Sequence, residues 1–317
     1  MRRFLVGSAL MLLSLMGCAY KTIQVNYMRP AEVNLKGIKQ IAIGGVYGYG
    51  PYEVAAASMK GQLEEAIFNS GRFTLVDRSR TQQVLGELAL VNSGIFDTSK
   101  APQLGKLLPA SIFIYATVNR YDTGTRVDRS EQKTSEGNVY YRYTRTSWAD
   151  TEASFQVIDC ETGVILAVKT LRGRAEDVYS EDNNSNPRYA DYNPLLDNAR
   201  NQVISAFMKV IAPYEDTANV RFAKQKKVPQ IEQGIGLVRV GDWSGSIQAF
   251  EAAYAAYPND SRVIYNLGLS YEYTFQFARA EEMFKKAYGL EPKNSVYKTE
   301  IENCRRLRAE YEKLQAQ

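Results

Sequence analysis

Apolar runs with two different spacings divide residues 38–213 into strands and helices. Short runs rich in β-branched and aromatic residues are typical of strands, and apolar positions three and four residues apart are typical of helices. Gly71 is well placed to end the first helix. The pattern predicts strands at residues 38–43, 73–76 and 111–118, and helices at residues 54–70, 79–90 and 103–108.

The second half of this region is rich in strands. A long strand-like run covers residues 139–158, and another covers residues 164–171. Glu161-Thr162-Gly163 lies between them as a turn signal, so the two runs predict a β-hairpin. A closing helix is expected at residues 194–211. Together these elements predict a mixed α/β domain over residues 38–213 with an antiparallel second half.

Residues 230–317 carry an internal repeat with a period of about 34 residues. Gly234, Phe250, Ala253 and Pro258 of the first copy recur as Gly268, Phe284, Ala287 and Pro292. This spacing resembles tetratricopeptide repeats, in which small residues let paired helices approach. We expect two such repeats, a capping helix at residues 297–314 and a charged linker at residues 214–229. The predicted fold class is α+β, with the mixed α/β domain followed by an all-α domain.

The resemblance to tetratricopeptide repeats implies a concave groove that binds peptide segments. The groove-facing positions that it implies are Ile231, Ile235 and Val238 in one copy and Tyr265, Asn266, Leu269 and Tyr273 in the other. The alternative is that these aliphatic and aromatic side chains belong to the core or to contacts between domains.

The N-terminus has the features of an export signal. Arg2 and Arg3 precede an apolar run that is shorter than the about 20 residues of a membrane-spanning helix. The run ends at Leu15-Met16-Gly17-Cys18, which resembles the lipobox of bacterial lipoproteins. This resemblance implies that residues 1–17 are removed and that Cys18 carries a diacylglycerol and an acyl chain. Residues 18–37 are then a polar tether that spans at most about 60 Å.

Composition narrows the range of functions. The formal charge of +4 falls to +2 when Arg2 and Arg3 leave with the signal, so nothing favours nucleic acid as a partner. The chain has no histidine, which removes the commonest general base and metal ligand. We therefore expect no enzyme activity, no metal and no cofactor besides the lipid on Cys18.

Several motifs between residues 72 and 165 share one family pattern. In chain order they are Arg72-Phe73-x-x-Val76-Asp77-Arg78, Leu85, Ser93-Gly94, Asp97, Leu104 to Leu108, Ala110 and Val157-Ile158-Asp159-x-x-Thr162-Gly163-x-Ile165. Their order and spacing resemble the curli-secretion (CsgG/HfaB) family over residues 38–213. Related folds occur in lipoproteins that activate penicillin-binding proteins and in flagellar accessory proteins, so the resemblance implies the fold more strongly than the function.

Subunits of a curli-type channel each add two β-hairpins to a shared outer-membrane barrel. A lipid-facing strand alternates apolar and polar positions over about 9–11 residues. The first candidate, residues 138–155, places Arg145 in the middle of one face, and the second, residues 175–193, is charged without an apolar band. A soluble version of the fold is therefore the preferred interpretation, and the channel stays as the alternative.

The glycine-rich segment of residues 44–51 lies between a predicted strand and a predicted helix. It lacks the Gly-Lys-Ser/Thr ending of a phosphate loop and the G-x-G-x-x-G spacing of a dinucleotide site. By resemblance to the secretion family, Tyr47, Tyr49 and Tyr52 become pore-loop residues if a ring forms. The simpler interpretation is a flexible turn with exposed tyrosines.

These features predict a lipoprotein of the outer membrane that faces the periplasm. Ala19 follows the lipidated cysteine where an aspartate would favour the inner membrane, by resemblance to the sorting rule of enteric lipoproteins. The expected function is a non-enzymatic assembly or scaffold factor for cell-envelope or secretion machinery. It would bind protein partners through the repeats, and a homo-oligomer stays open. The alternatives are a subunit of a curli-type secretion channel and a lipoprotein that activates peptidoglycan synthases.

Overall fold

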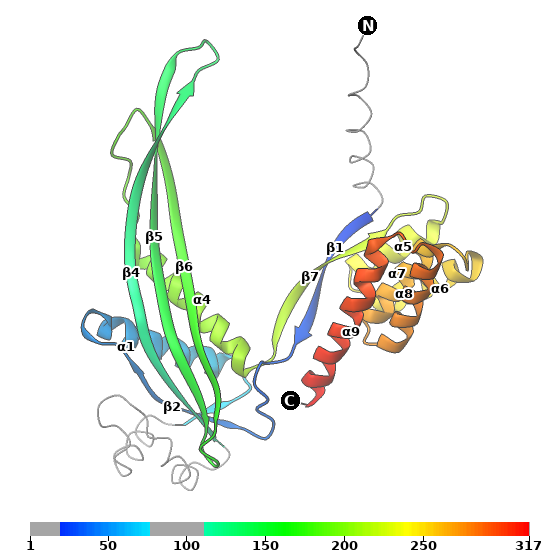
Figure 1. Ribbon diagram of the computed structural model, residues 1–317, viewed down its shortest axis with the longest axis horizontal. Coiled ribbons are helices and arrows are strands. Elements are labelled where there is room, and N and C mark those ends of the chain that lie inside the picture. The colour runs from blue at the N-terminus through cyan, green and yellow to red at the C-terminus, as the bar shows by residue number, and fades with distance from the viewer. Residues whose placement is uncertain (1–19, 77–110, 317) are drawn as a thin grey trace. The chain divides into compact units, whose positions relative to one another are not determined.

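The computed structural model describes residues 20–76 and 111–316 (Figure 1). The chain divides into two compact units, one of residues 31–212 and one that joins residues 1–30 to residues 213–317. We refer to them as the sheet unit and the helical unit. The signal segment, Cys18 and the helices predicted at residues 79–90 and 103–108 lie outside the described residues.

The sheet unit is built on five strands in the order β3-β2-β4-β5-β6. Strand β2 is parallel to both β3 and β4, and β4, β5 and β6 form an antiparallel meander. The strands are β2 (Gln40–Tyr47), β3 (Thr74–Leu75), β4 (Ser111–Lys133), β5 (Val139–Asp159) and β6 (Ile165–Asp182). The predicted hairpin and antiparallel second half are therefore present, but β4 and β6 are longer than the sequence pattern predicts.

Among the described residues of this unit, two helices cover one face of the sheet, and residues Gly50–Tyr52 form a short 3-10 turn before the first of them. They are α1 (Glu53–Asn69) and α4 (Tyr192–Ile211). Alternate residues of β5 point into this core, and Phe155 stacks on Phe207 of α4 with ring centroids 4.2 Å apart. Gly173 of β6 lies so close to the α4 backbone that an added Cβ would be 2.0 Å from the Ala199 carbonyl oxygen. The opposite face of β4, β5 and β6 carries polar side chains.

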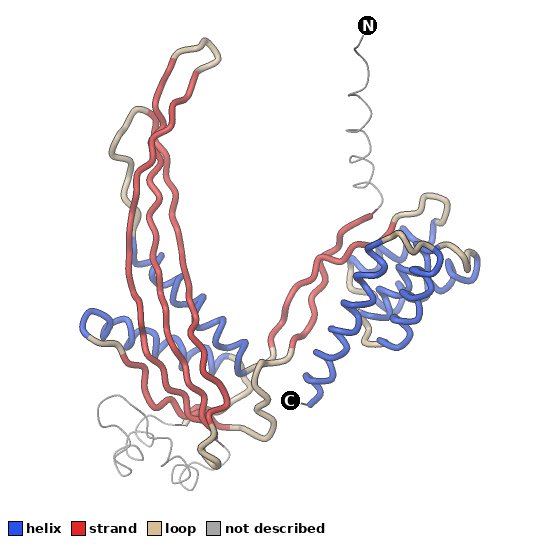
Figure 2. Tube along the Cα trace, in the orientation of Figure 1, coloured by secondary structure: helices blue, strands red, loops and turns tan. Residues whose placement is uncertain are grey.

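Strands β4 and β5 continue past the helices as a long hairpin (Figure 2). The extension of β6 runs through residues 175–182, which belong to the charged segment without an apolar band. Arg142 of β5 forms two hydrogen bonds with Asp182 of β6, at 2.8 and 3.1 Å. Strand continuation here depends on cross-strand pairing of polar groups rather than on an apolar band.

Arg145 is buried rather than directed to a lipid or solvent face. Its side chain donates hydrogen bonds to the Pro187 carbonyl at 2.8 Å and to Asn186 Oδ1 at 2.7 Å. Its guanidinium also lies 3.6 Å from the centroid of the Tyr189 ring. The asparagine-rich segment after β6 therefore folds back on β5 and satisfies this charge.

The glycine-rich segment is more ordered than the predicted flexible turn. Gly44 and Gly45 lie inside β2, and the β2–β4 register shifts between Ile43 and Gly45. A Cβ on Gly44 would lie 1.8 Å from the Phe113 ring, so only glycine fits beneath that ring. The segment thus interrupts the β2–β4 register and leaves room for the Phe113 ring.

The helical unit contains five helices and two strands among the described residues. The helices are α5 (Pro229–Arg239), α6 (Trp243–Ala256), α7 (Ser261–Glu272), α8 (Phe277–Leu290) and α9 (Ser295–Ala316). An added Cβ on Gly234 or Gly268 would come within 2.6 Å of the rings of Phe250 or Phe284, so each glycine lets two helices approach. The predicted order, a mixed α/β region followed by a region of several helices, is confirmed.

The predicted tether and linker are both partly wrong. Residues of the tether form β1 (Tyr20–Arg29), and residues of the linker form β7 (Tyr214–Ala223). The two strands pair antiparallel along their whole length, from Tyr20 opposite Ala223 to Arg29 opposite Tyr214. We call this pair the ribbon. Its alternating apolar residues Ile23, Val25, Val220 and Phe222 join the core of the helices.

No helix within the described parts of the chain combines the length and the apolar character needed to cross a membrane.

Candidate protein-binding sites

The residues predicted to line the repeat groove gather on α5 and α7, as the repeat pattern implies. Ile231, Ile235 and Val238 lie on α5, Tyr265, Asn266 and Leu269 lie on α7, and Tyr273 caps α7. All of them except the half-buried Tyr273 are buried. Their neighbours include the ribbon, because the buried residues of β1 and β7 belong to the same apolar cluster.

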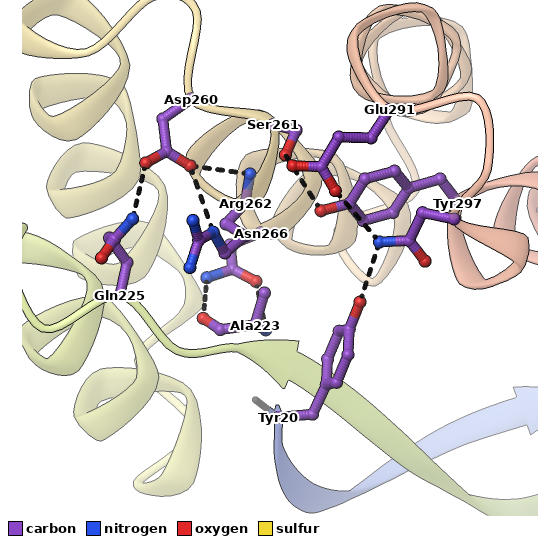
Figure 3. A network of polar contacts seen from close by, with 10 residues as sticks. Tyr20, Ala223, Gln225, Asp260, Ser261, Arg262, Asn266, Glu291 and Tyr297 are labelled. Carbon is purple, nitrogen blue, oxygen red and sulfur yellow. Dashed lines mark hydrogen bonds and ion pairs between the residues drawn. The ribbon is translucent and has the colours of Figure 1, made fainter. Parts of the chain in front are cut away.

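Asn266 fixes β7 against α7 through the strand backbone. Its Oδ1 accepts a hydrogen bond from the Ala223 N–H at 2.8 Å, and its Nδ2 donates one to the Ala223 carbonyl at 2.8 Å (Figure 3). Asn266 is fully buried, so both bonds form away from water. One side chain thus satisfies both backbone groups of a strand residue, as an amide does when it holds an extended peptide.

Residues on either side of this contact extend the network. Gln225, just beyond β7, donates to Asp260 Oδ2 at 2.9 Å, and Asn294 donates to the Tyr20 hydroxyl at 3.2 Å. Asp260 also caps α7, since its Oδ1 accepts from the Arg262 N–H. Figure 3 shows these side chains converging on the ends of the two strands.

Tyrosine rings pack against β1 near both of its ends. Tyr20 meets Tyr265 edge to face at 6.3 Å between centroids, and Tyr27 meets Tyr273 in the same way at 6.5 Å. Burial raises the pKa of Tyr265 and Tyr273 well above the usual value for tyrosine. Both phenols are therefore neutral at physiological pH, and the contact is apolar with hydrogen bonds at its edges.

The prediction of an open groove is therefore wrong, because the chain's own ribbon covers these residues. The alternative of core contacts describes these residues. The signal for the ribbon is present in the sequence as two short alternating runs, Ile23 with Val25 and Val220 with Phe222. Neither run is long, and about 190 residues separate the two, so local patterns alone do not pair them.

A second candidate site, which the sequence analysis misses, lies on the polar side of β4, β5 and β6. A groove of about 440 Å³ is lined by Arg120, Asp150, Thr151, Glu152, Arg172, Gly173, Arg174 and Gln202. Its charges alternate across the strands, because Arg120, Glu152 and Arg172 occupy neighbouring register positions. The sequence feature that indicates this groove is a charged residue at every second position of residues 172–176.

The charges of this groove are paired. Arg172 donates to Glu152, and Arg174 donates to Asp150 at 2.9 Å and to Glu176 at 2.7 Å. Arg174 also lies 5.1 Å from the Trp148 ring centroid. Because both carboxylates of the groove accept from arginines, neither is placed as a free general base. The surface suits recognition of a polar partner.

The three tyrosines of the predicted pore loop do not share one environment. Tyr47 stacks on Tyr115 with centroids 4.8 Å apart, Tyr49 is 62% exposed, and Tyr52 is half-buried at the start of α1. Their role in a ring stays a prediction. Within the described residues, no three Asp, Glu or Cys side chains group in a way that could hold a metal ion.

Residues 52–186 match the model of a known protein family, described as "Curli production assembly/transport component CsgG". The match confirms the resemblance to this family and covers somewhat less than half of the chain. It falls on the sheet unit, from the start of α1 to the segment that follows β6. No curated protein matches the sequence.

Several solved structures are similar at low sequence identity. Lipoprotein GNA1162 from Neisseria meningitidis is 15% identical, with 55% of this chain and 97% of that chain covered and a TM-score of 0.31. The LpoB C-terminal domain from Salmonella enterica is 16% identical, with 43% and 82% covered and a TM-score of 0.27. The PelC dodecamer from Paraburkholderia phytofirmans is 10% identical, with 60% and 99% covered and a TM-score of 0.29.

Proposed function

We propose that the protein is a non-enzymatic assembly factor of the cell envelope, anchored by lipid on Cys18 to the outer membrane and facing the periplasm. It holds protein partners of an envelope or secretion machine close to that membrane. The CsgG-family match over residues 52–186 supports the envelope setting. The absence of histidine and the paired carboxylates of the sheet groove support a function without catalysis.

The observation that carries this proposal is the start of β1 at Tyr20, two residues after Cys18. Tyr20 is held by Tyr265 and Asn294, and its partner strand is held by Asn266. The helical unit therefore follows the lipid anchor directly, with Ala19 as the connection. A unit attached in this way stays at the membrane surface when the lipid is inserted.

Partners then bind surfaces that the ribbon leaves uncovered. The groove face of α5 and α7 is occupied within the chain, so the polar face of β4, β5 and β6 is the first candidate in the sheet unit. Its alternating arginines and carboxylates favour a partner surface with complementary charges of both signs.

Cell fractionation of wild-type and Cys18→Ala proteins, followed by crosslinking and isolation of bound proteins, tests this proposal. We expect the wild type in the outer-membrane fraction with a defined set of partners. Cys18→Ala should move to the soluble fraction and lose those partners, while keeping the circular dichroism spectrum of the folded protein. A Cys18→Ala protein that stays with the membrane would contradict lipid anchoring.

A subunit of a secretion channel is the second candidate, favoured by the transport component in the description of the matching family. The two candidates differ in the shape of the purified full-length protein in mild detergent. Light scattering and negative-stain imaging should give a monomer or small oligomer for an assembly factor. Rings with a central opening would make the channel the function, with Tyr47, Tyr49 and Tyr52 as the first residues to test at the constriction.

A further inference from the structure

A small cavity of about 40 Å³ lies in the helical unit between β1 and the C-terminal ends of α7 and α9. Its wall is largely aromatic and apolar and includes Met28, Phe275, Phe277, Leu307 and Tyr311. A site for one water needs about 10–15 Å³, so this cavity has room for a slightly larger group. The acidic members of the wall are Glu272 and Glu310.

Glu272 is a buried carboxyl group that the fold does not satisfy. It is 1% exposed, and among the described residues neither carboxylate oxygen accepts a hydrogen bond from an N–H or O–H group, so the Cys304 thiol, a weak donor, is the donor near it. Such groups are rare because burial without a partner is costly. Burial, followed by the charge of Glu300, raises the pKa of Glu272 well above its usual value, and Arg306 and the Cys304 thiol act against this shift.

Glu310 differs from Glu272 because its charge is already matched. It accepts from Arg29 at 3.1 and 3.2 Å and from Arg306 at 2.8 Å. The unmatched acidic group of the cavity is therefore Glu272. Because the raised pKa favours the protonated form of Glu272, a cation that enters the cavity pairs with this carboxylate as the proton leaves to solvent. The aromatic faces around it also favour a cation.

Phe275 supplies a second sign of a site. Its φ angle is +63°, a left-handed conformation that is unfavourable for a bulky side chain. A glycine would remove this cost at the α7–α8 turn. The ring is 49% exposed and stacks on Tyr311 with centroids 4.6 Å apart. The chain thus keeps a strained and accessible aromatic residue beside an unsatisfied carboxyl group.

We propose that this cavity binds the ammonium group of a lysine side chain from a protein partner. The volume holds an ammonium and its neighbouring methylenes, so the rest of the ligand lies outside, over the half-exposed side chains of Met28 and Phe275. A lysine carries a compact charge on a flexible stem, whereas the planar guanidinium of arginine is larger. This inference deepens the proposed function, because it names the side chain by which a partner is held.

Titration of the full-length protein in detergent with the peptide acetyl-Leu-Lys-Leu-amide tests this site. The methionines are labelled with ¹³C at the ε-methyl group, and binding is followed by the chemical shifts of Met28 at the cavity and Met59 in the sheet unit. We expect saturable shifts at Met28 and none at Met59. The same peptide with acetyl-lysine, which keeps the stem and lacks the charge, should bind at least tenfold more weakly.

Variants separate binding from a structural role. Glu272→Gln should weaken lysine-peptide binding at least tenfold, and Glu302→Gln, an exposed control on α9, should bind like the wild type. Glu272→Met should abolish binding and raise the melting temperature by a few degrees, because a buried polar group without a strong hydrogen-bond partner is removed. Loss of stability in Glu272→Met would assign Glu272 a structural role and overturn the proposal.

Two further outcomes would also overturn it. Equal binding of the lysine and acetyl-lysine peptides would exclude charge recognition. Binding of n-butylammonium as tight as that of the peptide would make this a site for small amines rather than for a protein. Neither result would affect lipid anchoring or partner capture, which depend on Cys18 and are measured in cells.

Discussion

Single buried polar side chains in this protein form hydrogen bonds that hold short stretches of backbone in place. Asn266 satisfies both backbone groups of Ala223, and Arg145 is satisfied by one short segment after β6. In both cases a buried polar side chain fixes a piece of backbone that apolar packing alone would leave free to slide. Buried polar groups of this kind specify position more than they add stability.

Replacement of Asn266 by alanine should release β7 from α7. The variant leaves the N–H and carbonyl of Ala223 buried without partners, at about 1–3 kcal/mol for each unsatisfied group. We expect the helical unit to lose about 2–4 kcal/mol of unfolding free energy in urea, and hydrogen exchange at the Ala223 amide to become faster. Asn219→Ala, at an exposed position of the same strand, is the control and should change stability by less than about 0.5 kcal/mol. Similar losses in both variants would refute the role of Asn266.

Glu272 should make the helical unit less stable as the pH rises. A carboxyl group whose pKa is higher in the folded than in the unfolded chain binds its proton more tightly when folded. Its contribution is complete below the unfolded pKa and is lost as the pH rises through the folded pKa. Glu300, whose pKa is also raised by burial, adds to the same trend, while Arg306 opposes it.

Urea unfolding at a series of pH values from 4 upward measures this dependence. One proton gives a slope of at most about 1.4 kcal/mol per pH unit. Glu272→Met should reduce the slope, because the proton that Glu272 binds more tightly in the folded chain is no longer bound. Glu302→Gln should leave the slope unchanged. An unchanged slope in Glu272→Met would mean that Glu272 has an ordinary pKa in the folded protein.

At the scale of elements, the helix pairs depend on glycines placed opposite aromatic rings. Gly234 of α5 lies beneath Phe250 of α6, whereas a Cβ on Gly236 of the same helix would meet open space. Gly234→Ala forces the ring aside and should cost about 1–3 kcal/mol. Gly236→Ala should stabilise α5 by about 0.5–1 kcal/mol, since alanine favours helix. Thermal unfolding followed by circular dichroism compares the two, and a gain in stability from Gly234→Ala would contradict the packing argument.

The elements also show where sequence patterns succeed and where they stop. The helices that the pattern predicts at residues 54–70 and 194–211 agree within two residues with α1 and α4, because each has an apolar stripe of its own. For strand β4 the pattern predicts an end at residue 118, but the strand continues to Lys133, because its second part is polar and is held by pairing with β5. Local sequence patterns indicate which residues are buried, but they do not show that a strand has a hydrogen-bonded partner.

The candidate sites show the same limit of local sequence patterns. The sequence places the correct residues of α5 and α7 on one face, but it does not reveal that β1 and β7 cover that face. Residues 20–29 and 214–223 look like a tether and a linker until they are paired. The Glu272 cavity has no local signal at all, since it depends on β1, α7 and α9 meeting in space.

At the scale of the whole molecule, each compact unit has its own apolar core, and the helical unit is closed by a strand from the other end of the chain. Ile23 and Val25 of β1 point into the helical core, while Thr22 and Gln24 between them are exposed. The double variant Ile23→Asp/Val25→Asp buries two charges without partners and should unfold the ribbon and destabilise the helices. Its matched control, Thr22→Asp/Gln24→Asp, adds the same charges at exposed positions of the same strand.

Hydrogen exchange resolved by residue distinguishes the two units in this experiment. In Ile23→Asp/Val25→Asp, protection should fall across α5 to α9 and stay at the wild-type level in β4, β5 and β6, because the sheet unit has its own core. The control should keep protection in both units. If both units lost protection together, the ribbon would be part of one cooperative structure. If neither did, β1 would be a dispensable tether after all, and the direct link between the lipid anchor and the helices would be lost with it.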